Sequence, residues 1–101
     1  PIKADVSSED DVKRMVEAVV KQFGDYNVLI NNAAFGHFAP LVELDAARFN
    51  ELLATNVTGA MLAGRESARH FVAKSYGNIV NISSTAGMAG FAGGTAYVAT
   101  K

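Results

Sequence analysis

The chain contains no cysteine, which excludes disulfide bonds, thiolate catalysis and any cysteine-based zinc site. It has no surplus of basic residues either, because 9 Lys and Arg stand against 10 Asp and Glu and give a formal net charge of -1. Neither nucleic acid nor an anionic membrane surface is therefore an expected partner. No apolar run approaches the roughly 18 residues that a membrane-spanning helix needs.

Hydrophobic residues make up 50% of the chain and charged residues 19%, a composition typical of a packed core. The chain opens on Pro1 rather than on an initiator methionine and closes on Lys101, inside an expected helix. We therefore expect residues 1–101 to be the central part of one longer domain. By themselves they are expected to lack a cooperative melting transition, because an isolated parallel strand leaves backbone groups unpaired.

Three apolar strand candidates alternate with helical patterns. A first helix is predicted after the capping residues Ser7 and Ser8, with acidic residues in its first turn and an end at Gly24. Further helical patterns run from about Asp45 to Lys74 and onward from near Tyr97, and the strand candidates are Ile2 to Val6, Val28 to Ile30 and Asn78 to Ser83. This order predicts a doubly wound parallel α/β sheet with right-handed crossovers.

Small polar residues follow each strand candidate. They are Asp5 after the first, Asn31 and Asn32 after the second, and Ser83 and Ser84 after the third. Ligands of open parallel sheets bind at the carboxyl ends of the strands, so this edge is the expected site. Loops are commonly polar in any protein, so the alternative is an ordinary surface.

A sharper signal is a polar residue inside an apolar stripe. Asn56 follows Leu52 and Leu53 by four and three residues, so its side chain is expected to face inward. A buried amide without partners costs about 1–3 kcal/mol, so hydrogen-bond partners are required. Asn56 either ties the helix to a neighbouring backbone or holds a water near Tyr97 and Lys101.

Tyr97 and Lys101 are four residues apart, so on a helix they share one face. An ammonium beside a phenol favours the phenolate, which is a proton acceptor, and the pair therefore outlines a proton-transfer site. The same spacing also occurs by chance on surface helices.

Other chemistries fit less well. The glycine-rich segment from Gly87 to Gly94 lies between a strand and a helix but lacks the G-x-G-x-x-G spacing of a dinucleotide loop, and we interpret it as a wall of a substrate pocket. Ser84 is not within G-x-S-x-G, and as a nucleophile it would need His37 or His70 as its base. Neither histidine is paired with carboxylates at metal-ligand spacing, so no metal site is predicted.

Assembled in order, these residues resemble the short-chain dehydrogenase/reductase family over nearly the whole chain. The matching pieces are Asp5-Val6, Asn31-Asn32-Ala33-Ala34, Asn56 within Thr-Asn-Val-Thr-Gly, Asn81-Ile82-Ser83-Ser84 and Tyr97-x-x-x-Lys101. Each piece is weak alone, but all of them in this order are specific. The segment from Thr55 to Ala60 is similar to that of glucose 1-dehydrogenases and 3-oxoacyl carrier-protein reductases.

The resemblance implies a Rossmann-like fold whose first two and last strands lie outside this chain. It implies a catalytic tetrad of Asn56, Ser84, Tyr97 and Lys101. It also implies that NAD or NADP is bound by Asp5, Val6, Asn32, Ala33, Ala34, Tyr97 and Lys101. The family usually has Gly at the position of Ala34, where alanine adds a methyl group and resists a positive φ angle.

The implied activity is NAD(P)-dependent interconversion of a secondary alcohol and a ketone, with a small-molecule substrate and a cytoplasmic location. The resemblance further implies a homodimer or homotetramer of the full-length protein, for which the small residues Ala60, Ala63 and Gly64 would permit close helix packing. The alternative is a non-catalytic binding or scaffold protein on the same fold, in which the tetrad residues are only structural.

Overall fold

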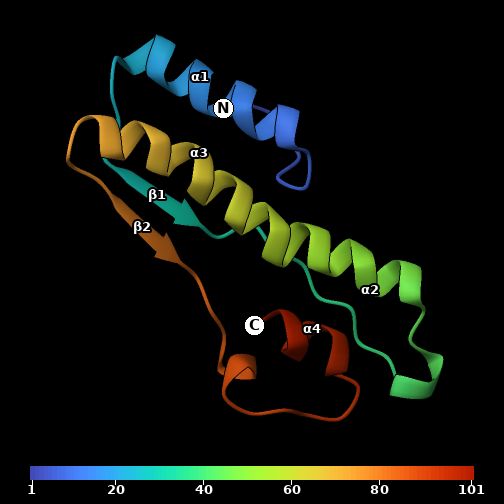
Figure 1. Ribbon diagram of the computed structural model, residues 1–101. Helices are drawn as coiled ribbons and strands as arrows, with labels where there is room; N and C mark the ends of the chain where they lie inside the picture. The colour runs from blue at the N-terminus through green and yellow to red at the C-terminus, as the bar shows by residue number, and fades with distance from the viewer.

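A computed structural model describes residues 1–101 and places helices along one face of a parallel sheet (Figure 1). Helix α1 (Glu9–Phe23) begins and ends where the sequence predicts. The Ser8 hydroxyl accepts a hydrogen bond from the Asp11 N–H at 3.3 Å, and acidic residues fill the first turn. Gly24 ends the helix at φ 79°, a left-handed conformation that glycine adopts without strain.

Strands β1 (Val28–Asn31) and β2 (Asn78–Asn81) pair in parallel, with Val28 opposite Asn78 and Asn31 opposite Asn81. The ladder continues for one more residue, where the Ile82 N–H donates to the Asn31 carbonyl at 2.9 Å. Parallel neighbours require a long crossover, and here a helical segment supplies it. The predicted parallel α/β arrangement is confirmed.

The predicted strand from Ile2 to Val6 is wrong. Residues 1–5 have no regular secondary structure, Val6 lies in a turn, and the sheet consists of β1 and β2. A strand exists only where a neighbour receives its backbone hydrogen bonds, and no strand of this chain lies beside Ile2 to Val6. The strand predicted from Asn78 to Ser83 is also shorter than expected, because β2 ends at Asn81.

The long helical pattern is realised as two α-helices joined by a wider turn. Helix α2 (Ala46–Leu53) is capped by Asp45, whose carboxylate accepts hydrogen bonds from the Ala47 and Arg48 N–H groups, each at 3.3 Å. A π-helical turn (Ala54–Thr58) follows, and α3 (Gly59–Ala73) continues in nearly the same direction (Figure 1). The sequence predicts the extent of this rod but not the turn inside it.

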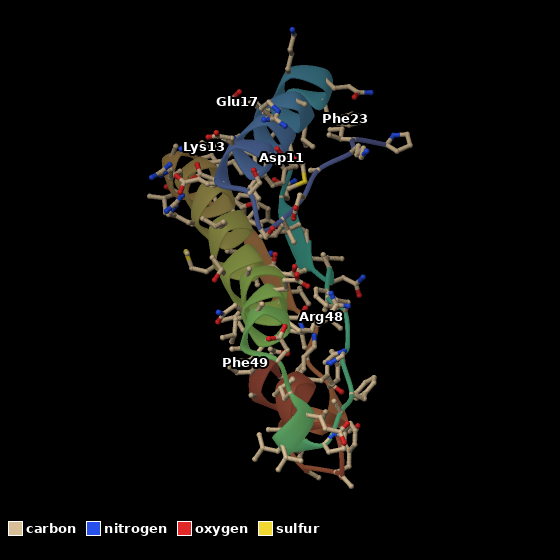
Figure 2. The ribbon with its side chains drawn as sticks, turned by 90° about the vertical axis from the view of Figure 1, so that its right-hand side faces the viewer. Asp11, Lys13, Glu17, Phe23, Arg48 and Phe49 are labelled. Atoms are coloured by element: carbon tan, nitrogen blue, oxygen red, sulfur yellow. The ribbon has the colours of Figure 1, made fainter.

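The molecule is elongated along this rod, with principal extents of 48 × 25 × 20 Å. Helix α1 lies beside α3, so Lys13 and Glu17 of α1 occupy one half of the molecule, whereas Arg48 and Phe49 of α2 lie in the other (Figure 2). The short helix α4 (Thr95–Thr100) packs at the α2 end of the rod (Figure 1). No helix of the chain is both long enough and apolar enough to cross a membrane.

The core is small, since 11 of the 101 residues are buried. Its hydrophobic cluster consists of Val12 from α1 with Leu62 and Ala63 from α3, and Leu29 of β1 packs against it. Ala63 therefore packs within the chain. Gly64 remains without close neighbours.

The other face of the sheet is bare. Val28, Ile30 and Val80 are 50%, 59% and 43% exposed, respectively. Parallel strands are normally covered on both faces. The bare face and the small core both support the expectation that these residues do not fold cooperatively by themselves.

A charged cluster fixes the loop between α1 and β1 to the end of α3. Asp25 Oδ1 lies 2.6 Å from both His70 Nε2 and Lys74 Nζ. Lys74 also donates to Asn27 Oδ1 at 2.6 Å, and the Tyr26 ring stacks on the His70 ring with 4.9 Å between centroids. The hydrogen bond from Lys74, followed by that from His70, lowers the pKa of Asp25 from 3.8 to about 2.

Replacing Asp25 with asparagine is expected to lower the urea midpoint of the whole protein at neutral pH, because Lys74 and His70 lose their shared acceptor. A carboxylate whose pKa is lowered by folding stabilises the folded state above its unfolded pKa, and this contribution disappears as the pH falls through the folded value. The difference in urea midpoint between wild type and Asp25→Asn should therefore shrink as the pH falls from 3.8 to about 2. Glu17→Gln, at an exposed carboxylate of α1, is the control. A difference that stays constant over this range would contradict the assignment.

Candidate active site

A cavity of about 150 Å³ lies where the two strands end and α4 closes against them. Its polar lining comes from both strands, the π-turn, the segment after β2 and the end of α4, and includes Asn31, Asn56, Asn81, Ser83, Thr100 and Lys101. Asn31 Nδ2 donates to Asn81 Oδ1 at 2.8 Å and to the Ala60 carbonyl at 3.2 Å, which joins both strands to α3. Asn31 and Asn81, the last residues of β1 and β2, thus meet Ser83 at one edge of the sheet. Of the residues predicted to converge here, Asp5, Asn32 and Ser84 do not line this cavity.

Asn56 is buried, at 9% exposure, and fully engaged. Its Oδ1 accepts from the Phe35 N–H at 3.0 Å, and its Nδ2 donates to the Phe35 carbonyl and to Thr100 Oγ1, both at 2.9 Å. The inward orientation is therefore confirmed. Of the two accounts of Asn56 given by the sequence, the tie to a neighbouring backbone is directly visible.

Tyr97 and Lys101 come together on α4. Lys101 Nζ lies 5.8 Å from the centroid of the Tyr97 ring and donates to the Ile82 carbonyl at 3.1 Å. The edge of the Tyr97 ring meets the Phe38 ring at 5.7 Å, and Phe38 in turn lies 5.9 Å from Phe91 of the glycine-rich segment. Lys101 thus lies between the Ile82 carbonyl and the Tyr97 ring. Phe38 and Phe91 supply aromatic neighbours, Phe38 in contact with Tyr97 and Phe91 with Phe38.

Ser84 caps the 3-10 turn formed by Thr85–Gly87, and its Oγ accepts from the Ala86 N–H at 3.1 Å. This turn packs directly against the end of α4, because a Cβ built on Gly87 would lie 2.5 Å from the Lys101 carbonyl oxygen. Ser83, rather than Ser84, lines the 150 Å³ cavity. The close approach at Gly87 links the position of Ser84 to that of α4.

A second cavity, of about 240 Å³, contains three of the residues that are expected to contact a cofactor. Val6, Asn32 and Ala33 all line it, together with Gly59. Asp5 is turned to other partners, because its Oδ1 accepts from the Ser7 N–H at 2.9 Å and from the Ser7 hydroxyl at 2.7 Å. The hydrogen bond from the Ser7 hydroxyl, followed by that from the Ser7 N–H, lowers the pKa of Asp5.

Alanine at position 34 is compatible with the backbone found there. The non-glycine residue with positive φ is Ser75, so Ala34 is not forced into the left-handed region. The Ala34 side chain is exposed.

Sequence reasoning missed two members of the site, Phe35 and Thr100. Phe35 acts through its backbone, which no side-chain pattern reveals. Thr100 sits inside the Tyr97 to Lys101 pentapeptide, where a hydroxyl three residues after Tyr97 is the available signal. His70, considered as a base for Ser84, is bound in the Asp25 cluster, and this supports its packing role.

A parallel sheet with polar side chains gathered at its carboxyl edge defines a ligand-binding α/β protein. The profile of the short chain dehydrogenase family matches residues 1–101, and the protein belongs to that family of oxidoreductases. Cis-4-hydroxycyclohexanecarboxylate dehydrogenase of Sinomonas cyclohexanicum is 37% identical over 101 residues, which are 99% of this chain and 41% of that protein.

Solved structures show the same fold. NAD+-bound xylitol dehydrogenase superposes with a TM-score of 0.92 at 38% identity, over 97% of this chain and 38% of that one. ElxO with NADP bound gives a TM-score of 0.89 at 35% identity, over 95% of this chain and 39% of that one. The predicted Rossmann-like fold is confirmed, and the chain spans less than half the length of these relatives.

Substituting Gly87 with alanine is expected to destabilise the whole protein by about 1–3 kcal/mol, because the new methyl group overlaps the Lys101 carbonyl and must displace the turn or α4. Urea denaturation measures the effect. Gly64→Ala is the matched control: a methyl group meets nothing within 4 Å there, and alanine in mid-helix should stabilise by about 0.5–1 kcal/mol. Equal effects of the two substitutions would contradict the close packing at Gly87.

Proposed function

We propose that the whole protein is an NAD(P)-dependent oxidoreductase that interconverts a secondary alcohol and a ketone by hydride transfer. The observation that carries this proposal is the position of Lys101 Nζ, 5.8 Å from the Tyr97 ring centroid and on the wall of the cavity that Asn56 also lines. A phenol beside an ammonium is suited to exchange protons with an alcohol.

The residues present fit a nicotinamide cofactor in one testable respect. Val6 and the consecutive pair Asn32 and Ala33 come from two separate segments yet line one largely apolar cavity, as a site for a flat ring requires. When bound, NAD or NADP supplies the hydride chemistry. Lys101 donates one hydrogen bond to Ile82, so two of its three N–H groups remain for the nicotinamide ribose.

In alcohol oxidation, Tyr97 would accept the proton of the hydroxyl group, and the hydride would leave the carbon that bears this hydroxyl for the oxidised cofactor. Reduction would run in reverse. Lys101 would hold its ammonium beside the Tyr97 ring, 5.8 Å from the ring centroid, during this step. Ser84 would hold the substrate oxygen beside Tyr97: its Oγ accepts from Ala86, and its own O–H remains free to donate. Asn56 would anchor a water between Lys101 and solvent as a hydrogen-bond acceptor, because both of its amide N–H groups are taken.

A binding or scaffold protein on the same fold is the second candidate, and one observation favours it. Both N–H groups of the Asn56 amide are taken by Phe35 and Thr100, so a structural role accounts for this residue without catalysis. Nicotinamide absorbance followed over a panel of secondary alcohols and ketones, with NAD and NADP in turn, separates the two candidates. Turnover supports the enzyme, and cofactor binding without turnover supports the binding protein.

Tyr97→Phe in the whole protein is expected to lower kcat by about 10²–10⁴-fold, because the proton acceptor is lost while the ring stays in place. The Kd for the cofactor, measured by nicotinamide fluorescence, should remain near the wild-type value. Tyr76→Phe is the control, since Tyr76 is 62% exposed and lies at the opposite end of α3. Near-normal turnover by Tyr97→Phe would reject the proposed mechanism.

A further inference from the structure

The Thr100 hydroxyl joins two parts of the site that are far apart in sequence. Its Oγ1 accepts a hydrogen bond from Asn56 Nδ2 at 2.9 Å and donates one to the Tyr97 carbonyl at 2.8 Å. The Thr100 hydroxyl has one proton, which it donates to the Tyr97 carbonyl. In its other hydrogen bond it must therefore be the acceptor, and Asn56 is the donor. Thr100 therefore links the π-turn to the helix that carries Tyr97 and Lys101.

Asn56 is a rigid anchor for this link. The Phe35 backbone offers it one donor and one acceptor, at 3.0 and 2.9 Å, so the orientation of the amide is fixed and its second N–H points to Thr100. The side chain is buried and sits in the π-helical turn (Ala54–Thr58). Such turns widen a helix locally, and they recur at functional sites.

Few side-chain bonds hold the start of α4. Gly94 at its N-cap contributes no side-chain hydrogen bond. The helix packs at the α2 end of the rod (Figure 1), and its polar ties are the Asn56 to Thr100 bond and the bond from Lys101 to Ile82. A bond from a Thr hydroxyl to the carbonyl three residues earlier is common in helices. The bond from Asn56, 44 residues away, makes this threonine specific.

We propose that Thr100 is a positioning residue, which locks α4 to Asn56 and thereby sets the placement of Tyr97 and Lys101. This proposal rests on the proposed function and adds to it a residue outside the tetrad. Thr100 acts through the bonds of its hydroxyl to Asn56 and to the Tyr97 carbonyl. Loss of its hydroxyl leaves a buried Asn56 N–H without a partner and frees α4 to shift.

The test uses the whole protein with its cofactor and compares Thr100→Val, which keeps the shape, with Thr100→Ser, which keeps the hydroxyl. Small displacements of catalytic groups cost up to about 10²-fold in rate, so Thr100→Val should lower kcat by about 10- to 100-fold while KM changes little. Thr100→Ser should remain close to wild type. Thr95→Val, at an exposed threonine of the same helix, should have no effect.

The split between kcat and KM separates positioning from mere loss of stability. If Tyr97 and Lys101 are displaced, kcat falls in the folded Thr100→Val protein while KM changes little. A threonine that only stabilises the fold would lower Tm and leave the kcat of the folded protein unchanged. Should Thr100→Val fail to fold by circular dichroism, Thr100→Ala is measured in the same way.

The link to Asn56 is tested by a double-mutant cycle. Adding Thr100→Val to Asn56→Ala should cause little further loss of Tm, because the bond between the two side chains is already broken. Losses of Tm that add up in the double mutant would overturn the proposal. So would an unchanged kcat in Thr100→Val, or a kcat of Thr100→Ser as low as that of Thr100→Val. An inactive wild type would instead reject the proposed function, and the near-ultraviolet circular dichroism of Tyr97, taken as the difference from Tyr97→Phe, would then report its placement in each Thr100 variant.

Discussion

The buried amide of Asn56 is the interaction on which the rest of the site depends. A buried amide has to be hydrogen-bonded, and Asn56 meets this requirement through the Phe35 backbone and Thr100. One side chain on the long helical rod thereby fixes the loop that leaves β1 and the helix that carries Tyr97. The π-helical turn around Asn56 is the local cost of aiming the amide at both.

The rod formed by α2 and α3 also holds β1 at both of its ends. Before the strand, Asp25 is bound to Lys74 at the end of α3, and after it Phe35 is bound to Asn56. Between these points Leu29 packs into the cluster of Val12, Leu62 and Ala63. The carboxyl end of β1 is thus positioned by polar contacts on either side of a small apolar core, which matters because the other face of the sheet is exposed.

Local signals predicted the elements that depend on local interactions. Ser8 and Gly24 bound α1 because a cap and a left-handed glycine act within one turn. The strand expected at Ile2 to Val6 failed because strands depend on a neighbour, which no local pattern supplies. The local pattern also did not predict the π-turn, and the Phe35 partner of its buried Asn56 is 21 residues away in sequence.

The candidate site was predictable at the level of residue types but not of partners. The burial of Asn56 and the shared face of Tyr97 and Lys101 follow from helical periodicity alone. Spacing could not reveal that Asn56 would find Thr100, nor that Gly87 would back onto the Lys101 carbonyl, because both contacts join segments whose approach is set by the tertiary fold.

Hydrogen-bonding capacity separates the groups that hold the frame from those that remain available to a ligand. Asn56 uses both of its N–H groups within the chain, so it has no donor left to offer. Lys101 uses one of three donors on Ile82, and Ser84 accepts from Ala86 without giving up its own proton. The ammonium and the hydroxyl are therefore oriented by the protein and still able to bind. The proposed proton transfer needs this combination of fixed position and spare donors, since groups that are already oriented need not reorganise.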